Sequence, residues 1–540
     1  MTHTTGHTIL LYYVMFNALY FSRYRSMLKP VALCTLLLFF ATLHLQAQIY
    51  IAPDGDDGNP GTLQQPYGTF PKAIQESMPG DTIYVRGGVY DLVNTITISA
   101  VKSGTEDQLV TITAYNEEVP LLDFSGQSFG SKGISLRANY WHFIGLQIKG
   151  AGDNGMEINF GSNNIIERCQ FYENRDTGLQ LSNGSEDNRI LNCDSYYNAD
   201  PPDYGDADGF APKLTVGSGN YFYGCRAWVN CDDGWDGYLR GADDVTTTLE
   251  NCWTWGNGYL KDGTDPGPQA NGNGFKMGGG DNSNSDLLMH HMVLINSVAF
   301  SNKNKGFDQN NNVGSMTLYN CTGYDNLTAN YRIQRTLNPG QTLTVKNSAS
   351  YQGLVQLGSF AVQETNSWLA PFSVTADDFL SLDTSFADAP RQPDGSLPEI
   401  ELLHLAEDSD LIDGGVDLGF PYFGAAPDLG AFESNYVMAI EPGNIPGDFQ
   451  LFQNYPNPFN PSTRIAYSLA KAERVTLAVF NALGREVVKL VDNAPQSAGR
   501  YTVDWNGRDA TGLPVSSGVY FYRLTSARGM SNARMMLLVK

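Results

Sequence analysis

Basic residues are scarce in this sequence. The 540 residues include 34 lysines and arginines against 57 aspartates and glutamates, a formal net charge of −23 at pH 7. Such a surplus of negative charge argues against nucleic acid or an anionic membrane surface as a partner. Long apolar runs are also scarce, and the clearest, Val31–Leu43, is too short to span a bilayer comfortably. With 56 glycines and a middle region dense in asparagine and aspartate, the composition is typical of a turn-rich β protein.

The first 47 residues have the pattern of a secretory signal region. Arg23, Arg25 and Lys29 precede the apolar run, and a cleavage point follows Ala47. Met27 is an alternative start of translation. We therefore expect a protein that is secreted or attached to the cell surface.

Residues 48–433 repeat a motif that predicts a parallel β-helix. Each copy has a strand, then Cys or Ser, two further residues, an aromatic residue and, two positions on, Asn or Gly. The copies lie at Cys169, Cys193, Cys225, Cys252, Ser297, Cys321 and Ser348. A strand-forming repeat without helices indicates a solenoid of stacked coils. The equivalent cysteines favour a ladder of buried thiols, although export would also permit disulfides.

The start of this region differs from the repeat. Residues 48–100 contain a short amphipathic segment, 70–78, which predicts a helix. A helix over the first edge of a stack of strands prevents that edge from pairing with other chains. We expect 48–100 to form the N-terminal cap of the β-helix.

A second motif, a turn glycine followed by a large apolar residue, predicts which side chains are neighbours. The apolar residues are Met156, Leu179, Phe210, Trp235, Phe275, Phe307 and Tyr331, of which the last follows Asn330 in place of glycine. They should point into the core, so the next residue of each copy should point outward. The outward column reads Glu157, Gln180, Ala211, Asp236, Lys276, Asp308 and Arg332.

This alignment gathers carboxylates on two adjacent coils. Asp208 and Asp233 directly precede the turn glycine in successive copies, Asp232 is next to Asp233, and Asp236 is in the outward column. Four carboxylates persist together when a strongly positive group neutralises them, and oxygen ligands suit a hard cation such as Ca²⁺. The alternative is a solvated acidic turn.

Lys276 follows Asp236 in the outward column, about 5 Å away at the spacing of β-strands. One interpretation is an ion pair with the flanking Asp236 and Asp308, which would raise its pKa and make it a poor base. If Asp236 binds a divalent cation instead, the pKa of Lys276 should fall towards that of a usable base.

Three separated segments, 206–210, 230–236 and 272–276, resemble polysaccharide lyase family nine. The resemblance covers about residues 48–435 and implies a secreted, calcium-dependent pectate lyase on a right-handed parallel β-helix. It implies Ca²⁺ binding by Asp208, Asp232, Asp233 and Asp236 and gives Lys276 the role of base. The implied reaction is β-elimination in polygalacturonate, with a 4,5-unsaturated product.

Other basic residues are candidates for contact with an acidic polysaccharide. Lys213, Arg332 and Arg335 could bind neighbouring substrate carboxylates, although structural ion pairs are an equal alternative for Lys213 and Arg332. The glycine- and asparagine-rich insertion 259–272 should form a loop at the edge of the binding groove. The alternative functions are a lyase for another uronic-acid polymer and a non-catalytic, calcium-dependent carbohydrate-binding β-helix. We expect a monomer.

The chain beyond the repeat divides into a linker, 434–448, and a separate domain, 449–540. Alternating strands at 463–469, 474–481, 499–505 and 518–525 predict a small β-sandwich, so the whole protein is predicted to be all-β. The segment 452–461, Gly518–Tyr522 and a final strand at 535–539 resemble the C-terminal sorting domain of type nine secretion. That resemblance implies recognition by outer-membrane secretion machinery.

Overall fold

The computed structural model describes residues 47–280, 283, 287–434 and 449–538, the last range with gaps at 453, 455–456, 458, 460, 482–483, 498 and 527–530. The predicted signal region, except Ala47, and the predicted linker, except Ser434, lie outside the described residues. No helix in the described ranges is long and apolar enough to cross a membrane.

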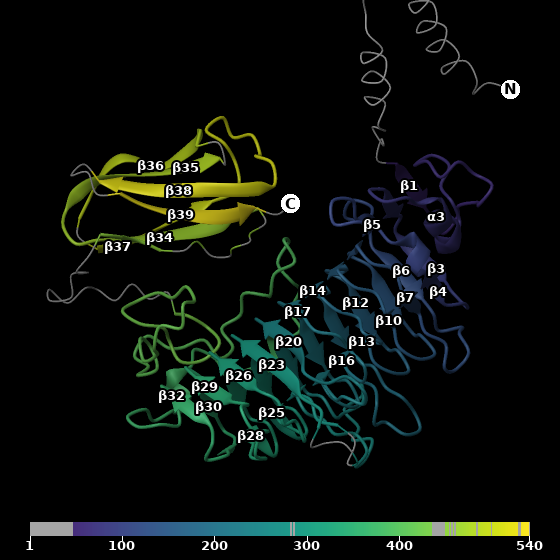
Figure 1. Cartoon of the computed structure of the whole chain (residues 1–540), viewed down its shortest axis with the longest axis horizontal. Helices are drawn as coiled ribbons and strands as arrows, with labels where there is room; N and C mark the ends of the chain where they lie inside the picture. The colour runs from purple at the N-terminus through teal and green to yellow at the C-terminus, as the bar shows by residue number, and fades with distance from the viewer. Residues whose placement is uncertain are drawn as a thin grey trace, which may run out of the picture. The chain divides into compact units, whose positions relative to one another are not determined.

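Three parallel sheets form the β-helix, as the repeat predicted (Figure 1). The first has twelve described strands: β1 (Gln48–Ile51), β2 (Thr82–Val85), β5 (Val110–Ala114), β8 (Trp141–Ile144), β11 (Ile165–Glu167), β14 (Arg189–Leu191), β17 (Asn220–Tyr223), β20 (Val245–Glu250), β23 (His290–Ile295), β26 (Met316–Tyr319), β29 (Leu343–Lys346) and β32 (Val362–Glu364). The second has ten: β4 (Ile96–Ile98), β7 (Ile134–Leu136), β10 (Met156–Asn159), β13 (Leu179–Ser182), β16 (Phe210–Pro212), β19 (Trp235–Asp236), β22 (Phe275–Lys276), β25 (Lys305–Asp308), β28 (Ala329–Ile333) and β31 (Val355–Leu357). The third also has ten: β3 (Gly88–Asp91), β6 (Pro120–Asp123), β9 (Gln147–Lys149), β12 (Gln170–Tyr172), β15 (Asp194–Tyr196), β18 (Arg226–Trp228), β21 (Trp253–Trp255), β24 (Val298–Phe300), β27 (Thr322–Tyr324) and β30 (Ala349–Tyr351).

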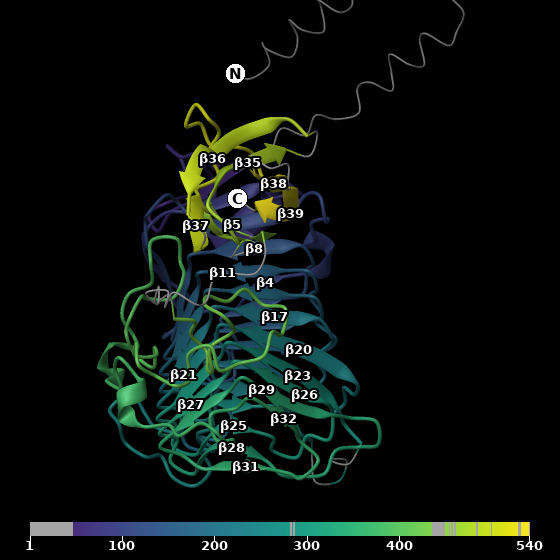
Figure 2. The ribbon, with the colours of Figure 1, turned by 90° about the vertical axis from the view of Figure 1, so that its left-hand side faces the viewer.

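Each complete coil contributes one strand to each sheet, and β1 and β32 extend the first sheet at its two ends, so successive coils lie one above another (Figure 2). Along each strand the buried and less buried residues alternate, as in β26, where Met316 and Leu318 are buried. This alternation places one face of every strand in the common core and the other outside. The predicted helix is α3 (Phe70–Glu76), which buries Phe70, Ala73 and Ile74 at the N-terminal end of the β-helix.

The predicted inward column is confirmed by the strand pairing. Met156 pairs with Leu179, and the series continues through Phe210, Trp235, Phe275 and Phe307 to Tyr331. All seven side chains are buried. The outward column holds as well, since Asp236 pairs with Lys276, Lys276 with Asp308, and Asp308 with Arg332.

The repeated cysteines are buried free thiols, which agrees with the predicted ladder. The thiols of Cys193, Cys225 and Cys252 donate to backbone carbonyls of their own and the preceding coils. Cys231, which is outside the ladder, donates to Asp200 Oδ1 at 3.1 Å.

The asparagine of the first motif forms a second, unexpected ladder inside the turns. Asn174, Asn198, Asn230, Asn257, Asn302 and Asn326 are buried. The amide Nδ2 of each of the first five donates to the Oδ1 of the asparagine one coil on, and that of Asn326 donates to Asn330, which follows in the same coil. Each Oδ1 also accepts from the backbone N–H of the preceding asparagine. The ladder therefore supplies partners for buried backbone groups where the chain turns out of the third sheet.

Replacing Asn198 by alanine should destabilise the β-helix by about 3 kcal/mol, because the backbone N–H and the side-chain Nδ2 of Asn174 lose their acceptor. Chemical denaturation would measure the change. Asn94→Ala, at an exposed turn position, is the control and should stay within about 0.5 kcal/mol of wild type. Equal stabilities for the two variants would show that the ladder is not a source of stability.

The segment 366–433 has little regular structure beyond the short 3₁₀ turns η3 (Ala376–Asp378) and η4 (Thr384–Phe386); another, η2 (Ala100–Lys102), lies near the N-terminal end. The segment 366–433 packs over the outer face of the third sheet, where Trp228, Trp255 and Phe300 are stacked. Arg391 of this segment pairs with the buried Asp194, which also binds Arg226.

The C-terminal domain has two antiparallel sheets around one core, which confirms the predicted sandwich. One sheet has β33 (Gln450–Leu451), β34 (Thr463–Leu469) and β37 (Gly499–Trp505); the other has β35 (Glu473–Asn481), β36 (Glu486–Gln496), β38 (Gly518–Ser526) and β39 (Ser531–Leu538). The sequence did not predict β36, whose pairing with β35 contains register shifts that break the strand alternation.

Candidate functional site

The site forms where three successive coils enter the second sheet. Asp208 precedes β16, Asp232 and Asp233 precede β19, and Lys276 ends β22. Backbone hydrogen bonds stack these turns: Gly209 N donates to Asp233 O, and Gly234 N donates to Asn273 O, at 3.0 and 2.9 Å. The turn requires glycine, because a Cβ at Gly234 would lie 2.0 Å from Thr254 Oγ1.

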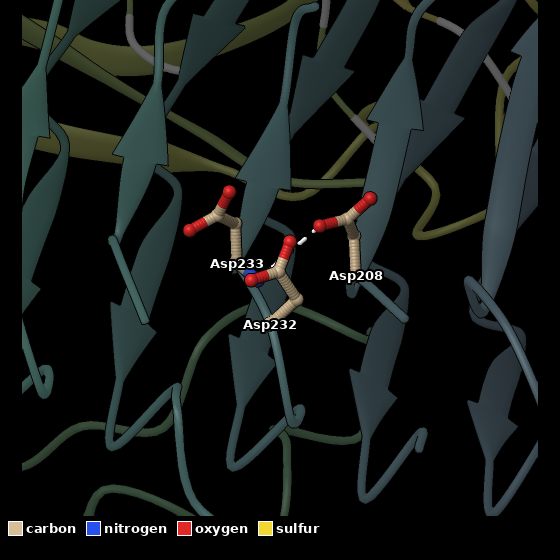
Figure 3. A group of neighbouring side chains, drawn as sticks. All are labelled: Asp208, Asp232 and Asp233. Carbon is tan, nitrogen blue, oxygen red and sulfur yellow. Dashed lines mark hydrogen bonds between the residues drawn. The ribbon is translucent and has the colours of Figure 1, made fainter. Parts of the chain in front are cut away.

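Three of the four predicted metal ligands meet in one cluster. Asp208, Asp232 and Asp233 are buried, and one carboxylate oxygen of each lies within 4.8 Å of the others. Figure 3 shows the three side chains on two neighbouring coils, with the Asp233 backbone N–H donating to Asp208. Asp236 is not in this group of three, but two lysines connect it to the cluster.

Lys276 and Lys213 connect the four carboxylates. Lys276 Nζ lies 3.1 Å from Asp233 Oδ2 and 3.3 Å from Asp236 Oδ1. Lys213 Nζ lies 2.7 Å from Asp208 Oδ2 and 3.8 Å from Asp236 Oδ2. Four carboxylates thus face two ammonium groups, which leaves two formal negative charges in a buried site.

The cluster has fewer positive than negative charges, and the pKa values of its aspartates reflect this. Burial raises the pKa values of Asp208, Asp232 and Asp233, and neighbouring carboxylates raise them further. Burial works to lower the pKa of Lys276, but Asp236 and Asp233 outweigh it and raise that pKa well above its usual value. In this arrangement Lys276 is a charged ammonium and a poor base.

Two asparagines hold the carboxylates, and the sequence did not identify them. Asn271 donates from its Nδ2 to Asp232 Oδ1 at 3.0 Å, and Asn273 donates from its backbone N–H and Nδ2 to Asp233 Oδ1 at 2.7 and 2.8 Å. Asn271 is near the end of the insertion 259–272, which forms a loop as predicted, and Asn273 directly follows the insertion. The sequence signal for Asn273 was its place before the turn glycine Gly274, the position that Asp208 and Asp233 hold in the preceding copies.

Lys303 contacts both the middle and the ends of this loop. Its Nζ donates to the Asp265 carboxylate and to Gly267 O. Its stem fills the space where the loop ends meet, since a Cβ at Gly258 or Gly272 would lie 2.6 or 2.7 Å from Lys303 Cβ. Lys303 therefore sets the conformation of the chain that leads into Asn271 and Asn273.

The predicted substrate-binding residues have different surroundings. Lys213 is only 8% exposed and is in the structural ion pair that the sequence left as an alternative. Arg332 is exposed and Arg335 half-buried, on or just beyond β28, two coils after Lys276. The ion pair between Lys276 and Asp308 is not formed, because Asp308 pairs with Lys305 at 3.0 Å.

The donor set fits a hard divalent cation. All its ligand atoms are oxygens, and the site carries the two unbalanced negative charges described above. Asn273 Oδ1, a buried oxygen beside the cluster, has no hydrogen-bond donor among the described residues, whereas Asp233 Oδ2 faces the Lys276 ammonium at 3.1 Å. A buried acceptor without a partner is costly, and a cation would satisfy Asn273 Oδ1.

His290 lies behind the site and is completely buried. Its Nδ1 is 2.8 Å from Gly237 O and its Nε2 is 2.8 Å from Thr247 Oγ1, so the neutral ring donates to the carbonyl and accepts from the hydroxyl. Burial lowers the pKa of His290 from 6.5 to about 4.

This depressed pKa should make the protein less stable in acid. The unfolded chain takes up the proton first, so the stability contributed by neutral His290 is complete above pH 6.5 and is lost as the pH falls towards 4, by about 3 kcal/mol. Denaturation at several pH values should show a smaller loss over this window in His290→Gln than in wild type. Parallel pH profiles would contradict the assignment.

Comparison with known proteins identifies the family. The model for the Pel9A-like right-handed β-helix region matches residues 49–348, and the model for the FlgD Ig-like domain matches 460–529. Pectate lyase L of Paenibacillus polymyxa (strain SC2) is 40% identical over 394 residues, which are 69% of this chain and 84% of that protein. Pectate lyase L of Dickeya chrysanthemi is 38% identical over 400 residues, 72% of this chain and 90% of that protein.

A solved structure agrees with this result. The crystal structure of pectate lyase Pel9A superposes with a TM-score of 0.66 at 37% identity and covers 72% of this chain and 97% of that one. The protein belongs to the Pel9A-like right-handed β-helix family and is a polysaccharide lyase.

Proposed function

We propose that the protein is a secreted pectate lyase that cleaves polygalacturonate by β-elimination, with Ca²⁺ held by Asp208, Asp232, Asp233 and Asp236. The observation that carries the proposal is the position of Lys276. Its Nζ shares Asp233 and Asp236 at 3.1 and 3.3 Å, at the edge of the carboxylate cluster, while its side chain remains 12% exposed. A purely binding β-helix has no use for an amine in this place.

The reaction removes the C5 proton of a uronate unit and breaks the bond from C4 to the glycosidic oxygen. Bound Ca²⁺ would draw charge from the uronate carboxylate and acidify that proton. If Asp233 and Asp236 held a cation, the Lys276 ammonium would lose its two carboxylate partners, its pKa would fall, and the free amine would accept the C5 proton. The electron pair of the C–H bond forms the 4,5 double bond, and the glycosidic oxygen leaves with the C4–O electron pair.

Substrate binding would use the exposed cations of the same face. Arg332, two coils beyond Lys276, is placed to bind the carboxylate of another uronate unit, and Arg335 is close to it in sequence. Lys213 would instead hold Asp208 and Asp236 in position from within the cluster. An acidic protein needs such cations to bind an acidic polymer.

The test of the function is release of unsaturated uronate, followed by its ultraviolet absorbance. We expect polygalacturonate to give this signal with Ca²⁺ and to lose it with a chelator. The same assay on other uronic-acid polymers distinguishes a different substrate. Cleavage that yields no unsaturated product would refute the β-elimination.

Replacing Lys303 by methionine should weaken Ca²⁺ binding by about 10-fold to 100-fold, because the loop that presents Asn271 and Asn273 loses its anchor. Isothermal titration calorimetry measures the affinity directly. Activity at saturating Ca²⁺ should return towards the wild-type value. A variant with wild-type affinity would show that the loop holds its conformation without Lys303.

We also propose that the C-terminal domain directs secretion across an outer membrane by the type nine route. The support is the sequence pattern of 452–461 and Gly518–Tyr522 in a separate β-sandwich. Deleting 449–540 should leave the lyase inside a host that has this route. Undiminished export of the truncated chain would refute the role.

A further inference from the structure

An open groove of about 640 Å³ lies beside the turns that leave the third sheet. Its lining includes Asn174, Tyr197, Ala199 and Pro201, together with residues 260–262 of the insertion 259–272. The volume is in the range of sites that hold small molecules. None of the proposed catalytic or metal-binding residues lines it.

The groove is on the same series of turns as the carboxylate cluster. Ala199 N donates to Asn174 O, and Cys231 N donates to Asn198 O, both at 2.9 Å, so the turns that line the groove stack directly onto the turn that leads to Asp232. Gly178 N donates to Asp208 O, which places the coil of Arg175 next to the coil of Asp208. Counting coils to Lys276 gives three steps, or roughly 14 Å along the axis.

Arg175 is the free cation of this groove. It is exposed and lines the groove, and no described residue pairs with its guanidinium or accepts a hydrogen bond from it. Only its backbone N–H is engaged, with Ala151 O at 3.0 Å. In a chain with a net charge of −23, an unpaired guanidinium close to the lyase site is a ready receptor for a carboxylate, which it can bind through two parallel hydrogen bonds.

The other basic residue of the groove is already paired. Lys261 pairs with Glu173, which is also 3.6 Å from Lys149 Nζ. The Lys261 ammonium lies 5.1 Å from the centre of the Tyr197 ring. Asp262 accepts from Thr264 N at 2.9 Å. Arg175 is therefore the cation of the groove that remains available to an anion.

The walls suit a ring with apolar and polar faces. Leu260, Pro201 and the ring of Tyr197 supply apolar surface to the lining. A sugar ring offers C–H groups to such surface while its carboxylate remains free for the guanidinium. Apolar walls with one well-placed polar group are typical of small-ligand sites.

We propose that this groove is a second carbohydrate-binding subsite, which holds a uronate unit of the same polymer three coils from Lys276, with Arg175 binding its carboxylate. The inference rests on the proposed function, because the ligand is the acidic polymer of that reaction. A polysaccharide that extends along the axis past Asp208 reaches Arg175 only if it has enough uronate units. Arg175 thus confers a preference for long substrates and leaves the chemistry at Lys276 unchanged.

The test measures KM and kcat of Arg175→Ala and Arg175→Gln on polygalacturonate and on galacturonate oligomers of increasing length. We expect KM to rise by roughly 10-fold to 100-fold for the polymer and the long oligomers, with no rise for the shortest oligomer cleaved and with kcat unchanged. Arg189→Ala is the matched control, since Arg189 is exposed on β14 of the first sheet. Calorimetry of a long oligomer with inactive Lys276→Ala, with and without Arg175→Ala, gives the same comparison without turnover.

Each outcome has one meaning. An unchanged KM at every length, or an equal rise for the shortest oligomer, overturns the subsite. A wild-type protein that releases no unsaturated product from any length refutes the proposed function instead. The melting temperature and Ca²⁺ affinity of both Arg175 variants should equal those of wild type, and an unfolded Arg175→Ala would leave Arg175→Gln to decide.

Discussion

Lys276→Ala should lower kcat on polygalacturonate by about 10²-fold to 10⁴-fold, the usual contribution of a general base. The only amine that contacts both Asp233 and Asp236 in the described structure is removed, and alanine offers no group to accept the C5 proton. The measurement is the rate of unsaturated uronate release at saturating Ca²⁺ and substrate.

A second measurement separates a catalytic from a structural role. Lys276 competes with any cation for Asp233 and Asp236, so Lys276→Ala should bind Ca²⁺ at least as tightly as wild type in calorimetry. Lys346→Ala, which removes an ion-paired lysine from β29 of the first sheet, is the control and should keep full activity. If Lys276→Ala retains its rate, the base must be another residue, and Arg332 is the next candidate on this face.

The part of the site that follows from the sequence is the part built on strands. Strand alternation and a constant spacing between coils fix which residues are neighbours once the turn glycines are aligned. This is why Asp236, Lys276 and Asp308 could be placed in one column although 40 residues separate the first two, as the pairing of β19, β22 and β25 confirms. The inward column was predictable for the same reason.

The contacts made by loops and long side chains could not be predicted in this way. The alignment places Cα atoms, but it does not say that Lys276 turns towards Asp233 or that Lys213 points back to Asp208. The insertion 259–272 has no counterpart in the other coils, so the period gives no information on where Asn271 ends up. Asn273 differs, because it directly precedes the turn glycine Gly274, as Asp208 and Asp233 precede theirs, and the same alignment would have placed it next to Asp233. The sequence showed an asparagine at the same position of successive repeats, but the hydrogen bonds between these asparagines are evident only in the structure.

Asp233→Asn should weaken Ca²⁺ binding by about 100-fold or more. The substitution keeps the size of the side chain and its acceptor for Asn273, but it removes one of the negative charges that the two ammonium groups leave unbalanced. Even changes to residues that only hold a metal ligand in position cost 10-fold to 100-fold in metal affinity, and Asp233 is one of the three buried carboxylates whose oxygens lie within 4.8 Å of one another.

The same substitution should stabilise the cation-free protein, or leave its stability nearly unchanged. Burial and neighbouring carboxylates raise the pKa of Asp233, so a neutral amide in its place relieves repulsion with Asp208 and Asp232. Thermal denaturation with and without Ca²⁺ tests both effects: the increase in melting temperature on adding Ca²⁺ should be large in wild type and nearly absent in Asp233→Asn. Asp325→Asn, at a turn outside the cluster, is the control and should keep the full increase. An equal increase in Asp233→Asn and wild type would place the cation elsewhere, because a cluster that has lost one of its central charges could not bind Ca²⁺ as tightly as before.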